Sequence, residues 1–165
     1  MPKRVGYLYD KMVDRDFIRD VIMEASRGRR NRHDIARVMK DLDGYVEKTY
    51  ELVATEIVVP SDPKVREIYV ESSEKYRKIK MAPFWPDGVI QWMLVAAMKP
   101  VLMRGMHPWS CASIPGRGGQ RIHKKIRSIL RNDPKGTKYA VELDVAQYYP
   151  SSSGKRLIWA LARKI

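Results

Sequence analysis

Apolar side chains recur at helical spacing in the first third of the chain. In residues 14–27 they lie three or four positions apart, and Asp14 precedes them as a candidate N-cap. Similar patterns predict helices over about 33–41 and 42–55. The pattern then changes, because residues 66–83 form two extended runs around a polar turn at Glu71–Glu74. We therefore expect a helical region followed by a β-hairpin.

The second half alternates between apolar and basic segments. Residues 87–103 are apolar almost all round, which predicts a buried helix with Pro86 in its first turn. The order of helical and extended segments along the whole chain indicates an α/β or α+β fold. The elements expected after this helix are a loop over 107–119, a basic amphipathic helix over 120–133, a strand over 138–145 and a helix over 154–165.

Composition limits the classes of protein that this chain can be. A chain of 165 residues, 44% hydrophobic, can bury one core, so we expect one domain or two subdomains. No apolar run approaches the roughly 20 residues that cross a bilayer, and the first residues lack a secretory signal, so we expect no membrane partner. Cys111 is the one cysteine, which excludes an internal disulfide and favours a cytoplasmic location.

The charge is strongly positive. Thirty-two Lys and Arg against nineteen Asp and Glu give a net charge of +13, which favours a polyanionic partner. Basic residues cluster at 27–33 and at 117–138, and a solvated helical face is the alternative explanation. Because Asp133 is the single acid in the second cluster, nucleic acid is the preferred partner. A membrane surface is less favoured, since the basic helix lacks aromatic anchors. The apolar residues expected to face inward on this helix are Ile122, Ile126, Ile129 and Leu130.

The predicted strand at 138–145 carries a carboxylate in an apolar setting. Side chains alternate along a strand, so Asp144 lies on the face opposite the apolar set. A carboxylate there can bind a divalent cation through oxygen, or it can cap the following turn, and the strand alone leaves both roles open. The apolar set expected to pack beneath a sheet is Tyr139, Val141, Leu143 and Val145.

Three motifs occur together in a fixed order. Residues 144–151 read DVAQYYPS, residues 74–94 read EKYRKIKMAPFWPDGVIQWML, and residues 113–126 read SIPGRGGQRIHKKI. This set resembles the motifs of prokaryotic and phage-type reverse transcriptases, which include group II intron, retron and diversity-generating enzymes. The resemblance implies fingers with a β-hairpin and helices, plus the first strand and helix of a palm, in an incomplete right-hand polymerase. The implied parts are an N-terminal helical region (1–55), fingers (56–132) and the start of the palm (133–165).

The resemblance also implies roles for single residues. Asp144 would be the catalytic metal ligand for Mg²⁺, with Mn²⁺ as an alternative, assisted by the backbone carbonyl of Val145. Tyr149 would lie under the incoming sugar and exclude a 2′-OH, while Tyr148 packs inward. Lys75 and Arg77 would hold the triphosphate of a dNTP; an exposed hairpin edge that discourages aggregation is the alternative reading.

The implied substrate is an RNA template with a DNA or RNA primer, extended with dNTPs. The glycine loop and helix N-terminus suit a phosphate chain. For Asp87 and Gln91, structural roles at a helix start are favoured over chemical ones. The residues expected to follow the template backbone are Arg117, Arg121, Lys124 and Lys125.

The chain departs from the family pattern in two places. After the tyrosines it reads PSSSGKRL, and the family's aromatic-x-Asp-Asp motif is missing from the 165 residues. Nucleotidyl transfer uses two metal ions, which Asp144 alone cannot hold. We therefore expect an N-terminal part, ending within a helical pattern at Ile165, that is inactive by itself. The alternative is a non-catalytic nucleic-acid-binding protein. The spacing of the three histidines and Cys111 does not favour a zinc site, and the sequence has no Walker loop.

Overall fold

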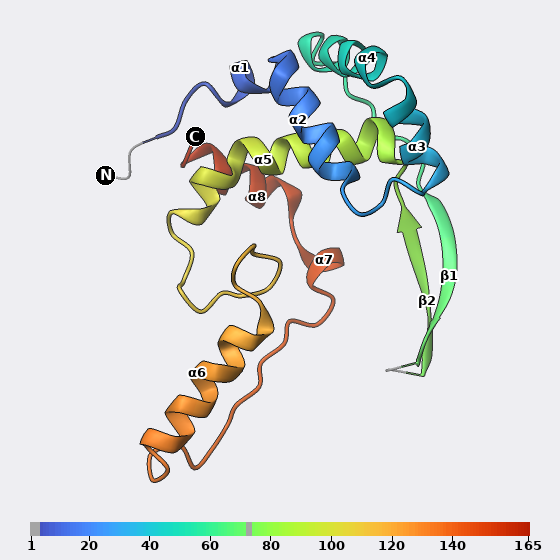
Figure 1. Ribbon diagram of the computed structural model, residues 1–165. Coiled ribbons are helices and arrows are strands. Elements are labelled where there is room, and N and C mark those ends of the chain that lie inside the picture. Colours follow the sequence, from blue (N-terminus) through green and yellow to red (C-terminus); the bar gives the residue numbers. More distant parts are fainter. Residues whose placement is uncertain (1–3, 72–73) are drawn as a thin grey trace. The chain divides into compact units, whose positions relative to one another are not determined.

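The helices predicted over 14–27, 33–41 and 42–55 are present, and a short helix over 8–12 was not predicted. The computed structural model describes residues 4–71 and 74–165, and of residues 149 and 150 the backbone alone. The predicted N-cap is confirmed, because the Asp14 carboxylate accepts a hydrogen bond from the backbone N–H of Phe17 at 2.7 Å. The first helices are α1 (Leu8–Met12), α2 (Arg15–Ser26), α3 (His33–Lys40) and α4 (Leu42–Ala54) (Figure 1).

The predicted hairpin is also confirmed. Strand β1 (Lys64–Val70) pairs with β2 (Lys75–Met81) in an antiparallel two-stranded sheet (Figure 1). Of the predicted turn at 71–74, residues 72 and 73 lie outside the described residues. The mixture of helices with an antiparallel hairpin confirms that α and β elements share this chain.

The helix expected from Pro86 begins later than predicted. Trp85 has extended backbone angles within the π-helical turn η2 (Phe84–Gly88), and the regular helix α5 runs over Val89–Met103. Asp87 does not act as a simple helix cap. Its carboxylate accepts a hydrogen bond from the Ser61 backbone N–H at 3.0 Å, and hydrogen bonding from Ser61 lowers the pKa of this carboxyl below its ordinary value. Asp87 therefore tethers the segment that leads into the hairpin.

Two of the remaining helices, over 119–132 and 154–162, match the basic and terminal helical patterns, and the short one over 148–151 was not predicted. These helices are α6 (Gly119–Asn132), α7 (Tyr148–Ser151) and α8 (Gly154–Ala162). The Ser153 hydroxyl caps α8 by accepting from the Arg156 backbone N–H. No helix in the described part of the chain has the length and apolarity that a membrane span requires.

The chain divides into two compact units, Val5–Pro100 and a second that holds Val101–Ile165. The division lies inside α5, at Pro100, which lacks the backbone N–H for a helical hydrogen bond. The three-part division into helical region, fingers and palm stays a prediction.

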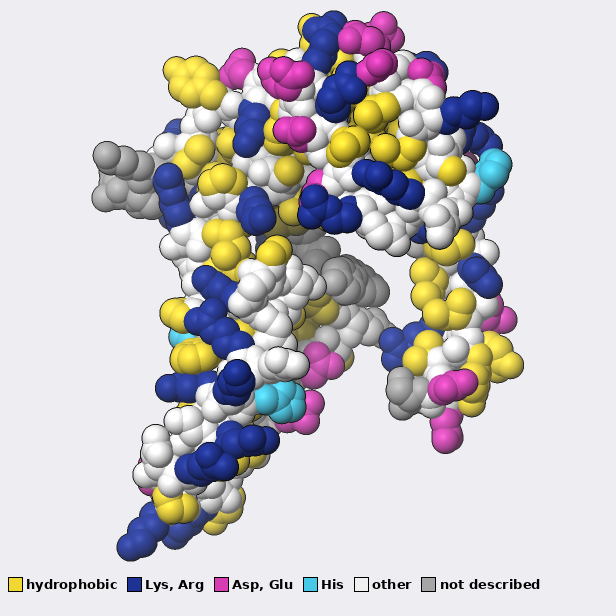
Figure 2. Space-filling model, viewed as in Figure 1, with side chains coloured by type: hydrophobic (Ala, Val, Ile, Leu, Met, Phe, Trp, Pro, Cys, Tyr) yellow, Lys and Arg dark blue, Asp and Glu magenta, His cyan; other side chains and the backbone are white. Residues whose placement is uncertain are grey.

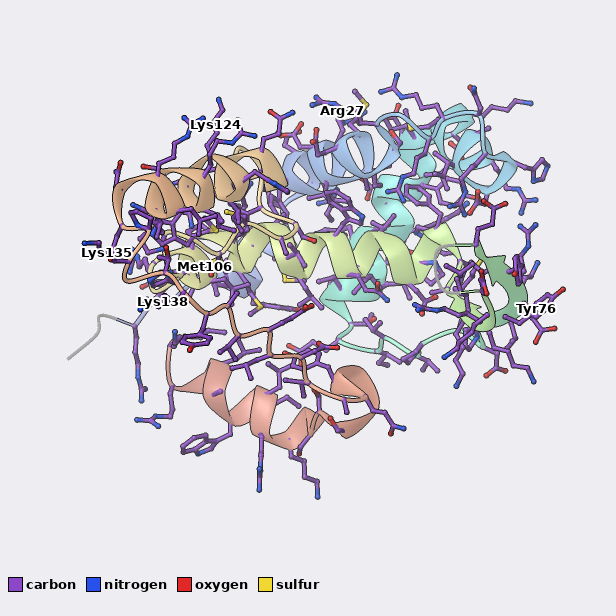
Figure 3. The ribbon with its side chains drawn as sticks, turned by 90° about the horizontal axis from the view of Figure 1, so that it is seen from below. Arg27, Tyr76, Met106, Lys124, Lys135 and Lys138 are labelled. Carbon is purple, nitrogen blue, oxygen red and sulfur yellow. The ribbon has the colours of Figure 1, made fainter. Side chains whose placement is uncertain are left out.

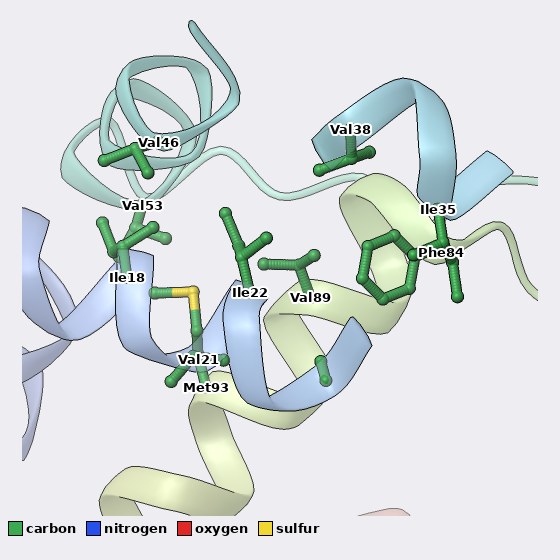
Figure 4. Packing of buried hydrophobic residues seen from close by; sticks show 11 residues of the cluster. Ile18, Val21, Ile22, Ile35, Val38, Val46, Val53, Phe84, Val89 and Met93 are labelled. Carbon is green, nitrogen blue, oxygen red and sulfur yellow. The ribbon is translucent and has the colours of Figure 1, made fainter. Parts of the chain in front are cut away.

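The main core belongs to the Val5–Pro100 unit. Helix α2 packs on α4, and α3 packs on both α4 and η2. Thr49 is a buried polar group in this region, and its hydroxyl donates to the Tyr45 carbonyl and accepts from Trp85 Nε1 at 3.0 Å. The buried apolar residues drawn in Figure 4 include Ile18, Val21, Ile22, Ile35, Val38, Val46, Val53, Phe84, Val89 and Met93.

Helix α5, predicted to be a buried helix because it is apolar almost all round, is buried on one side only. Val89, Met93 and Ala97, four residues apart, are buried on one side of the helix. Trp92, Leu94 and Val95 on its other sides are exposed. The core therefore covers a single stripe of α5. The apolar composition of the helix did not indicate how much of its surface is covered.

Candidate nucleic-acid interface

The loop before α6 has a backbone that depends on glycine. Gly116 has φ of +75°, a left-handed conformation that a side chain would strain. The Arg117 backbone N–H donates to the Ile114 carbonyl and closes a turn at 3.0 Å. Gly118 then occupies the N-cap of α6, where it offers no capping side chain. The loop therefore ends at the N-terminus of α6, where no side chain caps the backbone N–H groups and the helix dipole gives a partial positive charge.

The loop and the first turns of α6 surround a concave region of about 710 Å³, which we call the loop pocket. Trp109 lies in this pocket and is 40% exposed. The Arg121 guanidinium is 5.4 Å from the centroid of the Trp109 ring, and Lys125 Nζ is 5.0 Å from it. The pocket lining comprises Trp109, Gly116, Gly118, Gly119, Gln120, Arg121, Lys124 and Lys125.

The structure brings three of the four predicted template contacts together. Arg121, Lys124 and Lys125 come from adjacent turns of α6 and line the loop pocket, and Lys124 is labelled in Figure 3. Arg117 is used differently, because its guanidinium donates to the His107 carbonyl at 3.3 Å and joins two stretches of the loop. None of these four cations pairs with a carboxylate among residues 4–71 and 74–165. Their charge is therefore not neutralised by a carboxylate within that part of the chain.

Lys and Arg side chains gather along α6, with hydrophobic side chains between them (Figure 2). The prediction that the apolar stripe of α6 faces inward is wrong, because Ile126, Ile129 and Leu130 are about half exposed. Ile122 alone of the predicted four is half-buried. Helical periodicity places apolar residues on one stripe, but it does not supply an element to cover that stripe.

The strand predicted at 138–145 does not form. This segment has no strand partner within the described residues, and its predicted apolar face is solvent-exposed, with Tyr139 at 91% and Leu143 at 89%. A strand needs a neighbour for its backbone hydrogen bonds, and alternation of side chains cannot provide one. The expectation that one apolar set packs beneath a sheet is therefore wrong for Tyr139, Val141, Leu143 and Val145.

Asp144 is exposed, and its Oδ1 accepts a hydrogen bond from the Val145 backbone N–H at 2.9 Å. This contact is local, with the next residue along the chain, and both roles of Asp144 stay predictions. Tyr148 was expected to pack inward and is instead 60% exposed. The side chain of Tyr149 lies outside the described residues. Within those residues, no group of three or more His, Cys, Asp or Glu is placed to hold a metal ion.

The hairpin carries the two predicted triphosphate contacts. The register pairs Val70 with Lys75 and Ile68 with Arg77, so both cations project from the same face of the sheet as Lys64 and Arg66. All four are exposed. The structure thus brings Lys75 and Arg77 together on one basic face. That face belongs to the Val5–Pro100 unit, whereas the loop pocket belongs to the other.

Trp109 is the residue of the loop pocket that sequence reasoning missed. The sequence patterns gave Trp109 no role, yet its ring is partly exposed, as are those of Trp92 and Trp159. The available signal was a tryptophan in a loop directly before a basic helix, a combination that can place an aromatic ring beside cations.

Comparisons with protein-family models, with curated proteins and with solved structures found no match to this chain.

Proposed function

We propose that this chain forms the fingers and the first palm motif of an RNA-directed DNA polymerase, and that the loop pocket binds the phosphate backbone of the RNA template. The observation that carries the proposal is the clustering of Arg121, Lys124 and Lys125 around a glycine loop and a helix N-terminus. Cations without carboxylate partners among the described residues, beside a helix N-terminus that no side chain caps, suit a chain of phosphates. A cytoplasmic location fits a chain with one cysteine.

Other roles in the proposed enzyme follow the sequence motifs. Lys75 and Arg77 hold the dNTP triphosphate, for which a shared basic face is a suitable surface. Tyr149 excludes the 2′-OH of the incoming sugar. The primer, of DNA or RNA, supplies the 3′-OH.

The metal ligands present are too few for catalysis. Asp144 and the Val145 carbonyl supply hard oxygen ligands of the kind that Mg²⁺ prefers. Two ions about 4 Å apart need further carboxylates, and the described residues bring none to Asp144. The activity that we assign to these 165 residues themselves is therefore binding of template, with synthesis assigned to a protein that also carries the second carboxylate motif.

A non-catalytic nucleic-acid-binding protein is the second candidate. It is favoured by the isolation of Asp144, whose carboxylate contacts its own neighbouring backbone. Both candidates predict binding that weakens with salt. Only the polymerase predicts template-dependent incorporation of dNTPs.

The test starts with the coding DNA downstream of Ile165, where the proposal requires an aromatic-x-Asp-Asp motif within roughly the next hundred codons. The full-length product is then assayed for primer extension on an RNA template with dNTPs and Mg²⁺. We expect extension by the natural protein and its loss in the Asp144→Asn variant, with RNA binding unchanged. Extension that persists in Asp144→Asn would refute the assignment. Binding without any extension by the natural protein would establish the second candidate.

A further inference from the structure

The hairpin has a second face whose composition differs from that of its basic face. The register places Tyr69 of β1 directly opposite Tyr76 of β2. Lys78 and Lys80 follow Tyr76 on the same side, because side chains on one face of a strand are two residues apart. We call this surface the tyrosine face. Its residues are Val65, Glu67, Tyr69, Tyr76, Lys78 and Lys80.

The two tyrosine rings contact each other and remain open to solvent. Their centroids are 5.1 Å apart with an interplanar angle of 57°. Tyr69 is 51% exposed and Tyr76, labelled in Figure 3, is 72% exposed. A cross-strand aromatic pair stabilises a hairpin, which accounts for the contact between the rings. It does not account for two large aromatic surfaces left in water on a strand pair that carries many charges.

The charge around the rings favours an anionic partner. The tyrosine face carries Lys78 and Lys80 against one carboxylate, Glu67, which lies opposite Lys78. The other face of the same two strands adds four cations, Lys64, Arg66, Lys75 and Arg77, so the hairpin as a whole is strongly basic. Lys78 and Lys80 extend along β2 from Tyr76 at intervals of about 6.6 Å. Protein interfaces exclude lysine from their apolar centres, so this alternation does not suit a protein partner. Aromatic rings beside a row of cations are the combination that binds single-stranded nucleic acid.

We propose that the tyrosine face binds single-stranded nucleic acid, with Tyr69 and Tyr76 stacking on unpaired bases and Lys78 and Lys80 contacting phosphates. The inference rests on the nucleic-acid binding in the proposed function but not on catalysis. It adds a contact surface in the Val5–Pro100 unit, separate from the loop pocket. Bases within a duplex are covered by their neighbours, so this surface selects an unpaired strand.

The test measures fluorescence anisotropy of a labelled single-stranded RNA of mixed sequence. The variants are Tyr69→Ala and Tyr76→Ala, with Tyr76→Phe as the matched control that retains a ring. Each alanine variant is expected to bind about 5- to 150-fold more weakly, while the slope of affinity against salt stays unchanged because no charge is lost. Tyr76→Phe is expected to bind within about twofold of the natural protein.

A second measurement uses the natural protein, so that a misfolded variant cannot imitate the result. An RNA of the same length with abasic positions keeps its phosphates and loses its stacking surfaces, and it is expected to bind more weakly than the intact RNA. Equal binding of the two RNAs, or alanine variants that bind as the natural protein does, would overturn the inference. If Arg121→Ala weakens binding in that case, the loop pocket and the proposed function survive. If a full-length protein shows the stacking but extends no primer, the inference about the tyrosine face is supported and the proposed polymerase function is refuted.

Discussion

The loop pocket predicts how strongly salt should weaken RNA binding. Arg121, Lys124 and Lys125 line the pocket and lack carboxylate partners among the described residues. If each contacts one phosphate, each releases counterions when RNA binds. Replacing all three by alanine should therefore reduce the salt dependence of binding as well as the affinity.

The size of the effect follows from the number of contacts. On a single strand, each neutralised phosphate contributes about 0.7 to the slope of log affinity against log salt. Loss of the three cations should lower this slope by about 2. Between about 50 mM and about 200 mM salt, a change of that size corresponds to a difference of about 15- to 20-fold in the loss of affinity.

The assay is anisotropy of a labelled single-stranded RNA, titrated at several salt concentrations. Arg37→Ala is the matched control, because Arg37 is an exposed arginine on α3, in the other compact unit. Its slope should fall by far less than that of the triple variant. Arg121→Lys retains the charge beside Trp109 and should retain the slope. A triple variant with an unchanged slope and preserved binding would refute the reasoning, because other cations would then carry the phosphate contacts.

Two further predictions concern the Val5–Pro100 unit. In urea denaturation, Thr49→Val should lower the free energy of unfolding by about 1–3 kcal/mol, because Trp85 Nε1 loses its acceptor. The control Thr55→Val removes an exposed hydroxyl and should lower it by about 0.5 kcal/mol or less, so equal losses would contradict the prediction. Hydrogen bonds from the Arg15 guanidinium lower the pKa of Glu47 from its ordinary value of 4.5. Their contact therefore stabilises the fold above that value and is lost as pH falls through the lowered pKa. When the free energy of unfolding is measured from about pH 3 to about pH 7, Glu47→Gln should lose less stability toward acid than the natural protein, and an equal loss would refute the prediction.

The regular elements could largely be predicted from local patterns. Asp14 precedes an apolar repeat and caps α2, and the extended runs around Glu71–Glu74 form β1 and β2. Helix α6 lies within one residue of its predicted bounds. These features depend on interactions between residues close in sequence, namely caps, i to i+4 contacts and strands joined by a short connection.

Burial could not be predicted in the same way. Leu143 belongs to a strand-like alternation and Ile126 to a helical repeat, yet both side chains are exposed, and no strand forms at Leu143. Periodicity reports which side chains share a face, whereas burial needs a second element to cover that face. For the candidate site, the basic residues were visible as a cluster in the sequence, but Trp109 was not assigned to them because its contacts with Arg121 and Lys125 arise only when the loop folds back on α6.

The sequence by itself determined the positions of the longer helices to within a few residues, and those of the hairpin and the basic segments, since these depend on the order of neighbouring residues. The tertiary structure decided which apolar stripes are covered, left residues 138–145 without a strand partner in the described chain, and placed Trp109 among the cations of the loop pocket. It also set the register that joins Tyr69 to Tyr76. Each of these results depends on which other segment of the chain packs against or pairs with the one in question, and a periodic pattern does not specify that segment.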